Sequence, residues 1–265
     1  MNSLRCFRFF VLRCALAGLA WLVFSGAAAP VSEPDPASLP PSRRVVIPKL
    51  QGALTLNGVL DESVWARAVE IGAFVLADTG GAVREATSVR AWYDDAALHL
   101  GWTCVDADIQ ATFTARDSKF WEEEVVEFFV TRGDLARYYE LQWNPLGGVF
   151  DALIANELDA RGVSRRIVGD WSFTAAGMRS AVKVSGTVQQ SDDRDERWQV
   201  EVTIPFADLG GAAPKPGEVW RGNFYRYNRD AKHPVELQSW SPVFLRGFHQ
   251  PIERLHRRDI VAKDF

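Results

Sequence analysis

Cysteine is nearly missing from this sequence, which has three cysteines in 265 residues. Two of them, Cys6 and Cys14, lie within the first 29 residues, so Cys104 stands alone in the remainder. A single cysteine cannot form an internal disulfide, and the fold must therefore be held by its core. Thr103 and Val105 flank Cys104 and no His and Asp constellation lies nearby, which favours a small core residue over a nucleophile.

The motifs that identify many enzymes are also absent: a nucleophile elbow, a His-Glu-x-x-His helix, a phosphate-binding glycine loop and a Cys-x-x-Cys pair. Carboxylates are plentiful at residues 122–124 and at Glu127. Consecutive strand residues point to opposite faces, however, whereas a glycosidase needs two carboxyls that converge on one bond. We therefore predict a protein that is not an enzyme.

Positive charge is in deficit outside the first 29 residues, where 27 Lys and Arg stand against 34 Asp and Glu. The formal net charge of that part is −7, and it contains no basic cluster. This balance argues against nucleic acid and against an anionic membrane as partners. The charge balance does not argue against a neutral ligand.

Long apolar runs are limited to one, from Cys14 to Phe24, which three arginines precede and the small residues 25–29 follow. This layout predicts a secretory signal peptide over residues 1–29. A retained anchor is the alternative, but the run is shorter than the roughly 20 residues of a spanning helix. Cleavage would leave a secreted or periplasmic protein without a membrane segment.

Residues 30–43 contain five prolines among small and acidic residues, which predicts an extended linker. The folded domain is expected over residues 44–265. It opens with a β-like run at residues 45–47 and an Asn57-Gly58 turn, and Asp61 is placed to cap a short helix that Trp65 anchors.

Apolar residues then alternate with polar ones almost throughout the chain, as in Trp198, Val200, Val202 and Ile204. This period of two, with turn residues between the runs and no repeating βαβ pattern, predicts an all-β fold. We expect an antiparallel β-sandwich, immunoglobulin-like or jelly-roll-like, with one or two short helices. Its expected strands lie at residues 89–93, 98–104, 125–130, 138–143, 149–154, 178–188, 198–204 and 220–227.

Tryptophan is unusually frequent, with nine residues after position 29. Six of them fall in regular strand or helix patterns and are expected to pack in the core: Trp65, Trp92, Trp102, Trp143, Trp198 and Trp220. Trp121 opens the run Trp-Glu-Glu-Glu-Val-Val-Glu-Phe-Phe at the entry to a strand, and Trp240 lies just before Pro242. An indole face can stack on a sugar ring, and loop-edge aromatics are where ligands meet a sandwich. Trp121 and Trp240 are therefore candidate binding residues.

Four segments occur in the order in which similar segments occur in the family 9 carbohydrate-binding modules and their DOMON-like relatives, and the sequence resembles that family. These segments are Leu-Asn-Gly-Val-Leu-Asp-Glu-x-x-Trp at residues 56–65, residues 89–94, the run at 121–129, and Ser-Trp-Ser at 239–241. The resemblance implies a secreted, non-catalytic module that binds a mono- or oligosaccharide between two tryptophans, here Trp121 and Trp240. It also implies that Glu127 binds sugar hydroxyls.

Four polar residues complete the candidate site. Glu127 stands on an otherwise apolar strand, where a buried carboxylate needs a partner; a salt bridge to Arg226 is the equal alternative. Gln142 can bind hydroxyls, although Glu140 and Gln142 stand where the family places Arg and Asn. Asn144 and Asn228 are secondary candidates, and each is more often a turn or cap residue.

Two further ligands are considered. Calcium is known in the family, and the acidic loops at residues 192–196 and 106–108 supply oxygen ligands, although solvated turns explain both as well. Some DOMON-like sandwiches bind haem for electron transfer, which would require Met178 or a histidine as axial ligand. A protein-interaction sandwich that has lost its sugar site is the third alternative, and Glu140 in place of a basic residue is its best support.

Overall fold

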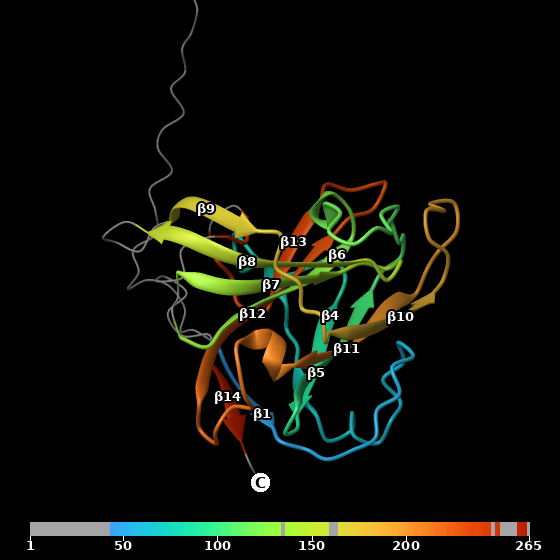
Figure 1. Ribbon diagram of the computed structural model, residues 1–265. Coiled ribbons are helices and arrows are strands. Elements are labelled where there is room, and N and C mark those ends of the chain that lie inside the picture. The colour runs from blue at the N-terminus through green and yellow to red at the C-terminus, as the bar shows by residue number, and fades with distance from the viewer. Residues whose placement is uncertain (1–42, 134–135, 159–163, 245–246, 250–258, 264–265) are drawn as a thin grey trace, which may run out of the picture. The chain divides into compact units, whose positions relative to one another are not determined.

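A computed structural model describes residues 43–133, 136–158, 164–244, 247–249 and 259–263 (Figure 1). The predicted signal peptide lies outside the described residues, as does the predicted linker apart from Arg43. Within the described ranges, no helix combines the length and the apolar composition needed to cross a membrane.

The domain is a sandwich of two sheets, and every strand pair is antiparallel except the pair formed by β1 and β14. The large sheet has the order β1-β14-β12-β6-β7-β8-β9, with β13 beside β12 and β3 beside β13, and the small sheet has the order β10-β11-β5-β4-β2. In the large sheet the strands are β1 Arg44–Pro48, β3 Val75–Leu76, β6 Val125–Thr131, β7 Arg137–Trp143, β8 Val149–Leu158, β9 Ser164–Asp170, β12 Val219–Asn228, β13 Glu236–Ser239 and β14 Asp259–Lys263; in the small sheet they are β2 Val69–Ile71, β4 Thr87–Tyr93, β5 Ala97–Val105, β10 Arg179–Ser185 and β11 Arg197–Pro205.

The main core lies between the sheets and is built by the alternation that the sequence displays. Leu98, Leu100, Trp102 and Cys104 of β5 are buried in it, together with the alternate residues of β11 from Trp198 to Ile204. The thiol of Cys104 is fully buried, and burial raises its pKa far above the usual range. All six tryptophans expected to pack are buried, which confirms that prediction.

The outer face of the small sheet is covered by the segment from Leu50 to Ala68. Trp65 packs edge-to-face on Trp92 with ring centroids 6.2 Å apart, and its Nε1 donates a hydrogen bond to Glu201. Glu201 is predicted to face solvent, yet it is buried because this segment lies over it and donates Asn57 and Gly58 backbone N–H groups to its carboxylate.

The predicted helix after Asp61 is wrong: residues 63–67 form consecutive turns instead. Two short 3-10 helices occur elsewhere in the described part, η2 at Phe120–Glu122 and η3 at Phe206–Leu209. The stretch after Asp61 is too short to form a stable helix by itself. The packing of Trp65 and the hydrogen bonds to Glu201 hold it on the sheet without regular helical hydrogen bonds.

Candidate functional site

The outer face of the large sheet carries a row of polar side chains that strand register brings together. Glu127 of β6 lies opposite Gln142 of β7 and opposite Tyr225 of β12. Side chains on one face alternate with a period of two, so Glu140 follows Gln142 on the same face. The side chains on the other face of β6, such as Phe128, point into the core between the sheets.

A cavity of about 300 Å³ opens over this row. Its walls come from β6, β7, β8, β9 and β12, from η2 and from the segments that follow β9 and β13. The lining residues are Trp121, Glu127, Glu140, Phe150, Ile154, Ile167, Gly169, Trp171, Tyr227 and His249. Such a volume is at the lower end of the range for small-molecule sites.

Two tryptophans and a phenylalanine form an aromatic corner at one side of the cavity. Trp121 belongs to η2, and Trp171 directly follows β9. Their ring centroids are 5.8 Å apart at an interplanar angle of 74°, and both rings meet Phe150 edge-to-face. Trp171 is 50% exposed, so its ring is accessible to a ligand. The sequence analysis gave Trp171 no role, because strand β9 was not predicted and the position of Trp171 at its end could not be recognised.

Trp240 does not belong to this corner, and its predicted place opposite Trp121 is wrong. It is 5% exposed and packs T-shaped on Phe224 in the core between the sheets. The strand register explains this position: Ser239 pairs with Tyr225 on the outer face, so the next residue faces inward and donates its backbone N–H to Phe224.

The two carboxyls of the cavity are buried and lack a cationic partner among the described residues. Glu127 is 2% exposed, and no described side chain or backbone group forms a hydrogen bond with its carboxyl. Burial and the neighbouring Glu140 raise the pKa of Glu127 well above its usual range. Burial likewise raises the pKa of Glu140 to about 7, although Gln142 donates a hydrogen bond of 2.6 Å to it.

His249 lies against this pair. Its Nδ1 is 2.7 Å from the hydroxyl of Tyr138, and its Nε2 is 3.7 Å from a carboxylate oxygen of Glu140. Burial lowers the pKa of His249 to about 4, so the ring is neutral at neutral pH and does not supply a positive charge.

The alternative partner proposed for Glu127, Arg226, points to the opposite face of the sheet. Arg226 is fully buried and binds the carboxylates of Glu124 at 2.7 Å and Asp106 at 2.9 Å. It also donates to the side chain of Asn228, which in turn donates to Glu85. Asn228 is therefore part of a buried network between the sheets and does not line the cavity.

Asn144 also has a structural role. It is buried in the turn between β7 and β8, where its Oδ1 accepts the backbone N–H of Gly148 at 2.7 Å and its Nδ2 donates to the carbonyl of Phe113. Asn144 thus follows the turn alternative, whereas Asn228 belongs to the buried network. Gln142 lies next to the lining residues Glu127 and Glu140, but it is fully buried and does not itself line the cavity.

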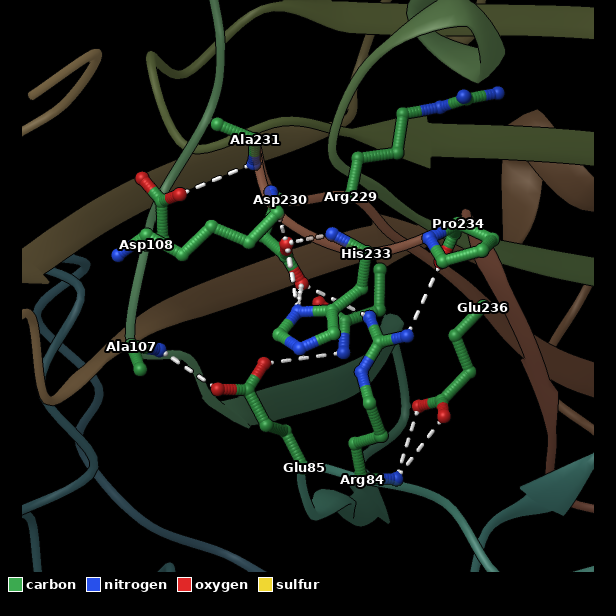
Figure 2. Close-up of polar contacts among 12 residues, drawn as sticks. Arg84, Glu85, Ala107, Asp108, Arg229, Asp230, Ala231, His233, Pro234 and Glu236 are labelled. Atoms are coloured by element: carbon green, nitrogen blue, oxygen red, sulfur yellow. Dashed lines mark hydrogen bonds and ion pairs between the residues drawn. The ribbon is translucent and has the colours of Figure 1, made fainter. Parts of the chain in front are cut away.

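The carboxylates of the acidic loops accept hydrogen bonds from backbone N–H groups of the protein. Figure 2 shows Asp108 accepting the backbone N–H of Ala231, and Glu85 accepting that of Ala107. Asp195 accepts backbone N–H groups with both oxygens, from Thr187 and Ile109. Among the residues that the structure describes, no three His, Cys, Asp or Glu side chains gather as a metal site. The carboxylates of Asp108 and Asp195 are thus already engaged by backbone N–H groups.

Comparisons with known proteins agree with the sandwich. A candidate carbohydrate-binding protein from Bacteroides uniformis ATCC 8492 superposes with a TM-score of 0.63 at 19% identity, over 85% of this chain and 100% of that chain. A family 9 carbohydrate-binding module from Caldicellulosiruptor kristjanssonii in complex with cellotriose gives 0.53 at 13% identity, over 84% and 95%. Such a module from the same organism with glucose gives 0.52 at 13% identity, over 84% and 97%.

The family itself is identified from the sequence profile. Among curated proteins, none matches this chain significantly. The family model of Carbohydrate-binding family 9 matches residues 82–253, which include the strands and loops that form the cavity from Trp121 to His249. Because this match extends over more than half of the sequence, the chain belongs to carbohydrate-binding family 9.

Proposed function

We propose that this protein is a secreted or periplasmic, non-catalytic module that binds a mono- or oligosaccharide in the cavity on the outer face of its large sheet. The observation that carries the proposal is the combination of an exposed indole, Trp171, with buried polar groups in one cavity of about 300 Å³. A sugar presents exactly two kinds of surface, C–H faces and hydroxyls, and this cavity offers partners for both. The glucose and cellotriose complexes of the Caldicellulosiruptor modules support the ligand class.

The arrangement of the aromatic corner differs from a parallel clamp. The rings of Trp121 and Trp171 are in edge-to-face contact, so a sugar would lie against the corner and not between two parallel faces. Its hydroxyls would reach Glu127 and the side-chain oxygen of Gln142, which is buried without a hydrogen-bond partner. A buried acceptor without a donor is costly, and a ligand hydroxyl would remove that cost.

Calorimetric titration with glucose and with cellotriose tests the proposal. The Trp121→Ala and Trp171→Ala variants are each expected to bind about five- to thirtyfold more weakly than the wild type, because stacking on one aromatic ring contributes about 1–2 kcal/mol. Val46→Ala is a control, since it trims an exposed apolar side chain on β1, outside the cavity. Wild-type affinity in both tryptophan variants would remove the aromatic corner from the site, and no binding of any sugar would refute the proposal.

A glycine positions Trp171. A Cβ added at Gly169 would lie 2.5 Å from the Nε1 of Trp171, so Gly169→Ala must displace the indole. We expect severalfold weaker sugar binding and a shifted tryptophan fluorescence spectrum, with little loss of stability because Trp171 is half exposed. Gly133→Ala is the matched control, since its added Cβ meets nothing within 4 Å. Unchanged affinity in Gly169→Ala would contradict the role given to Trp171.

Geometry supports a non-catalytic role. Hydrolysis requires one carboxylic acid and one carboxylate that flank the glycosidic bond. Glu127 and Glu140 stand on neighbouring strands of one face and would approach a ligand from the same side. Cellotriose incubated with the protein is therefore expected to remain intact on chromatography.

The haem alternative has less support. Met178 is buried in the core, and His99 stacks on Trp92 with ring centroids 3.9 Å apart. Only His249 of these candidates lines the cavity, without Met178 or another histidine among the lining residues.

A further inference from the structure

Two buried acceptors at the cavity lack a hydrogen-bond donor among the described residues. One is the carboxyl of Glu127, which lines the cavity, and the other is the side-chain oxygen of Gln142, which is fully buried next to it. The amide N–H of Gln142 is already used, because it donates to Glu140 at 2.6 Å. A ligand that satisfies these groups must therefore bring donors of its own.

Positive charge is also missing from the described walls of the cavity. His249 is neutral at neutral pH because burial lowers its pKa to about 4. Arg229 donates to the carbonyl of Trp121 and lies over the ring of Tyr227, and it is not among the residues that line the cavity. The other titratable groups near Glu127 and Glu140 are phenols: burial raises the pKa of Tyr138 and Tyr227, and Tyr225 lies opposite Glu127 on β12.

We propose that the sugar bound in this cavity carries a protonated amine, as a 2-amino-2-deoxyhexose does, with the ammonium placed between Glu127 and Glu140. This inference rests on the proposed sugar-binding function and names its ligand class. An ammonium has donors and no acceptor, so it matches the unpaired oxygens of Glu127 and Gln142, and its charge would stabilise the two buried carboxylates once they ionise. A metal ion fits less well, because the described residues include no group of three side chains that could hold one.

Binding of such a ligand would be coupled to proton release. Burial raises the pKa of both carboxyls, so the pair retains protons near neutral pH in the empty cavity. An ammonium favours the ionised carboxylates and lowers their pKa values. The affinity is therefore expected to rise with pH between about 6 and 7.5, as long as the amine stays protonated, and protons are released on binding.

The experiment is calorimetric titration with D-glucosamine, N-acetyl-D-glucosamine and D-glucose, each in phosphate and in MOPS buffer. These buffers contain no primary amine and differ in ionisation enthalpy, so the difference between the two observed enthalpies counts released protons. We expect D-glucosamine to bind about tenfold or more tightly than both neutral sugars, with proton release for D-glucosamine alone.

Variants test the placement of the ammonium. Glu140→Gln keeps the shape of the side chain and removes its charge, so the preference for D-glucosamine over D-glucose should fall by about tenfold. Glu157→Gln is the matched control, because Glu157 is exposed near the end of β8 and pairs with Arg166 outside the cavity. It should retain the wild-type preference.

The outcomes separate this inference from the proposed function. Binding of D-glucose or cellotriose with no preference for D-glucosamine would overturn the inference and leave the sugar site in place. Equal binding of methylammonium and D-glucosamine would also overturn it, because the site would then recognise an amine without a sugar. If no sugar of either kind binds, both proposals fall.

Discussion

Replacing Arg226 with alanine is expected to lower the free energy of unfolding by about 3–5 kcal/mol. Arg226 of β12 binds Glu124, Asp106 and the backbone carbonyl of Val105 at the end of β5, so it connects the two sheets through a fully buried guanidinium. Its removal leaves two carboxylates without their cation in a dry interior, which costs more than the pair contributes when intact.

Chemical denaturation measures this effect, and Arg166→Ala provides the comparison. Arg166 forms an ion pair with Glu157 in which both side chains are more than half exposed, so its loss should change stability by less than about 1 kcal/mol. Combining Arg226→Met with Glu124→Gln should be less damaging than Arg226→Met alone, because one orphaned charge is removed as well. An Arg226→Ala variant as stable as Arg166→Ala would contradict the assigned role.

Replacing Trp240 with alanine is expected to cost about 3–5 kcal/mol, the range for a large aromatic residue removed from a core. The ring of Trp240 is 5% exposed and fills the space beside Phe224, where alanine would leave a cavity. Thermal unfolding followed by circular dichroism detects such a change.

The milder variant Trp240→Phe separates packing from binding. It keeps an aromatic ring in the core, and we expect it to fold and to bind sugars as the wild type does. Trp171→Ala should show the reverse, with nearly unchanged stability and weakened binding, because its ring is half exposed. Loss of sugar binding in a folded Trp240→Phe protein would contradict the core role of Trp240 and indicate that it belongs to the binding site.

The sheets could be predicted from the sequence because burial on one face of a strand imposes a period of two. The run at Arg197–Pro205 has this pattern, whereas the run at Val125–Thr131 is apolar and buried on both faces; both form strands within a residue or two of the predicted ends. Strands β2, β3, β9, β13 and β14 were not predicted. Apolar and polar residues alternate little in β9. Its four side chains from Arg165 to Val168 are all exposed, so no buried face imposes a period of two on this strand.

The site was predicted in part. Glu127 was identified because a carboxylate on an apolar strand is unusual, and Trp121 because of its position at a strand entry. Trp240 was misplaced because Pro242, two residues later, indicated a loop edge, whereas only the pairing of Ser239 with Tyr225 at the end of β13 decides which way the next side chain faces. Glu140 was seen as a departure from the family, but its approach to Glu127 depends on the register between β6 and β7.

The parallel pairing of β1 with β14 constrains the order in which the domain can assemble. Within the large sheet β1 is joined only to β14, so its hydrogen-bonding partner is the last described strand of the chain (Figure 1). During synthesis from the N-terminus, residues 44–48 must wait without that partner until residues 259–263 have emerged. This edge of the sheet therefore cannot close before residues 259–263 have emerged, and a nascent chain that has not reached residue 259 would present β12 without this partner at Val219–Arg221.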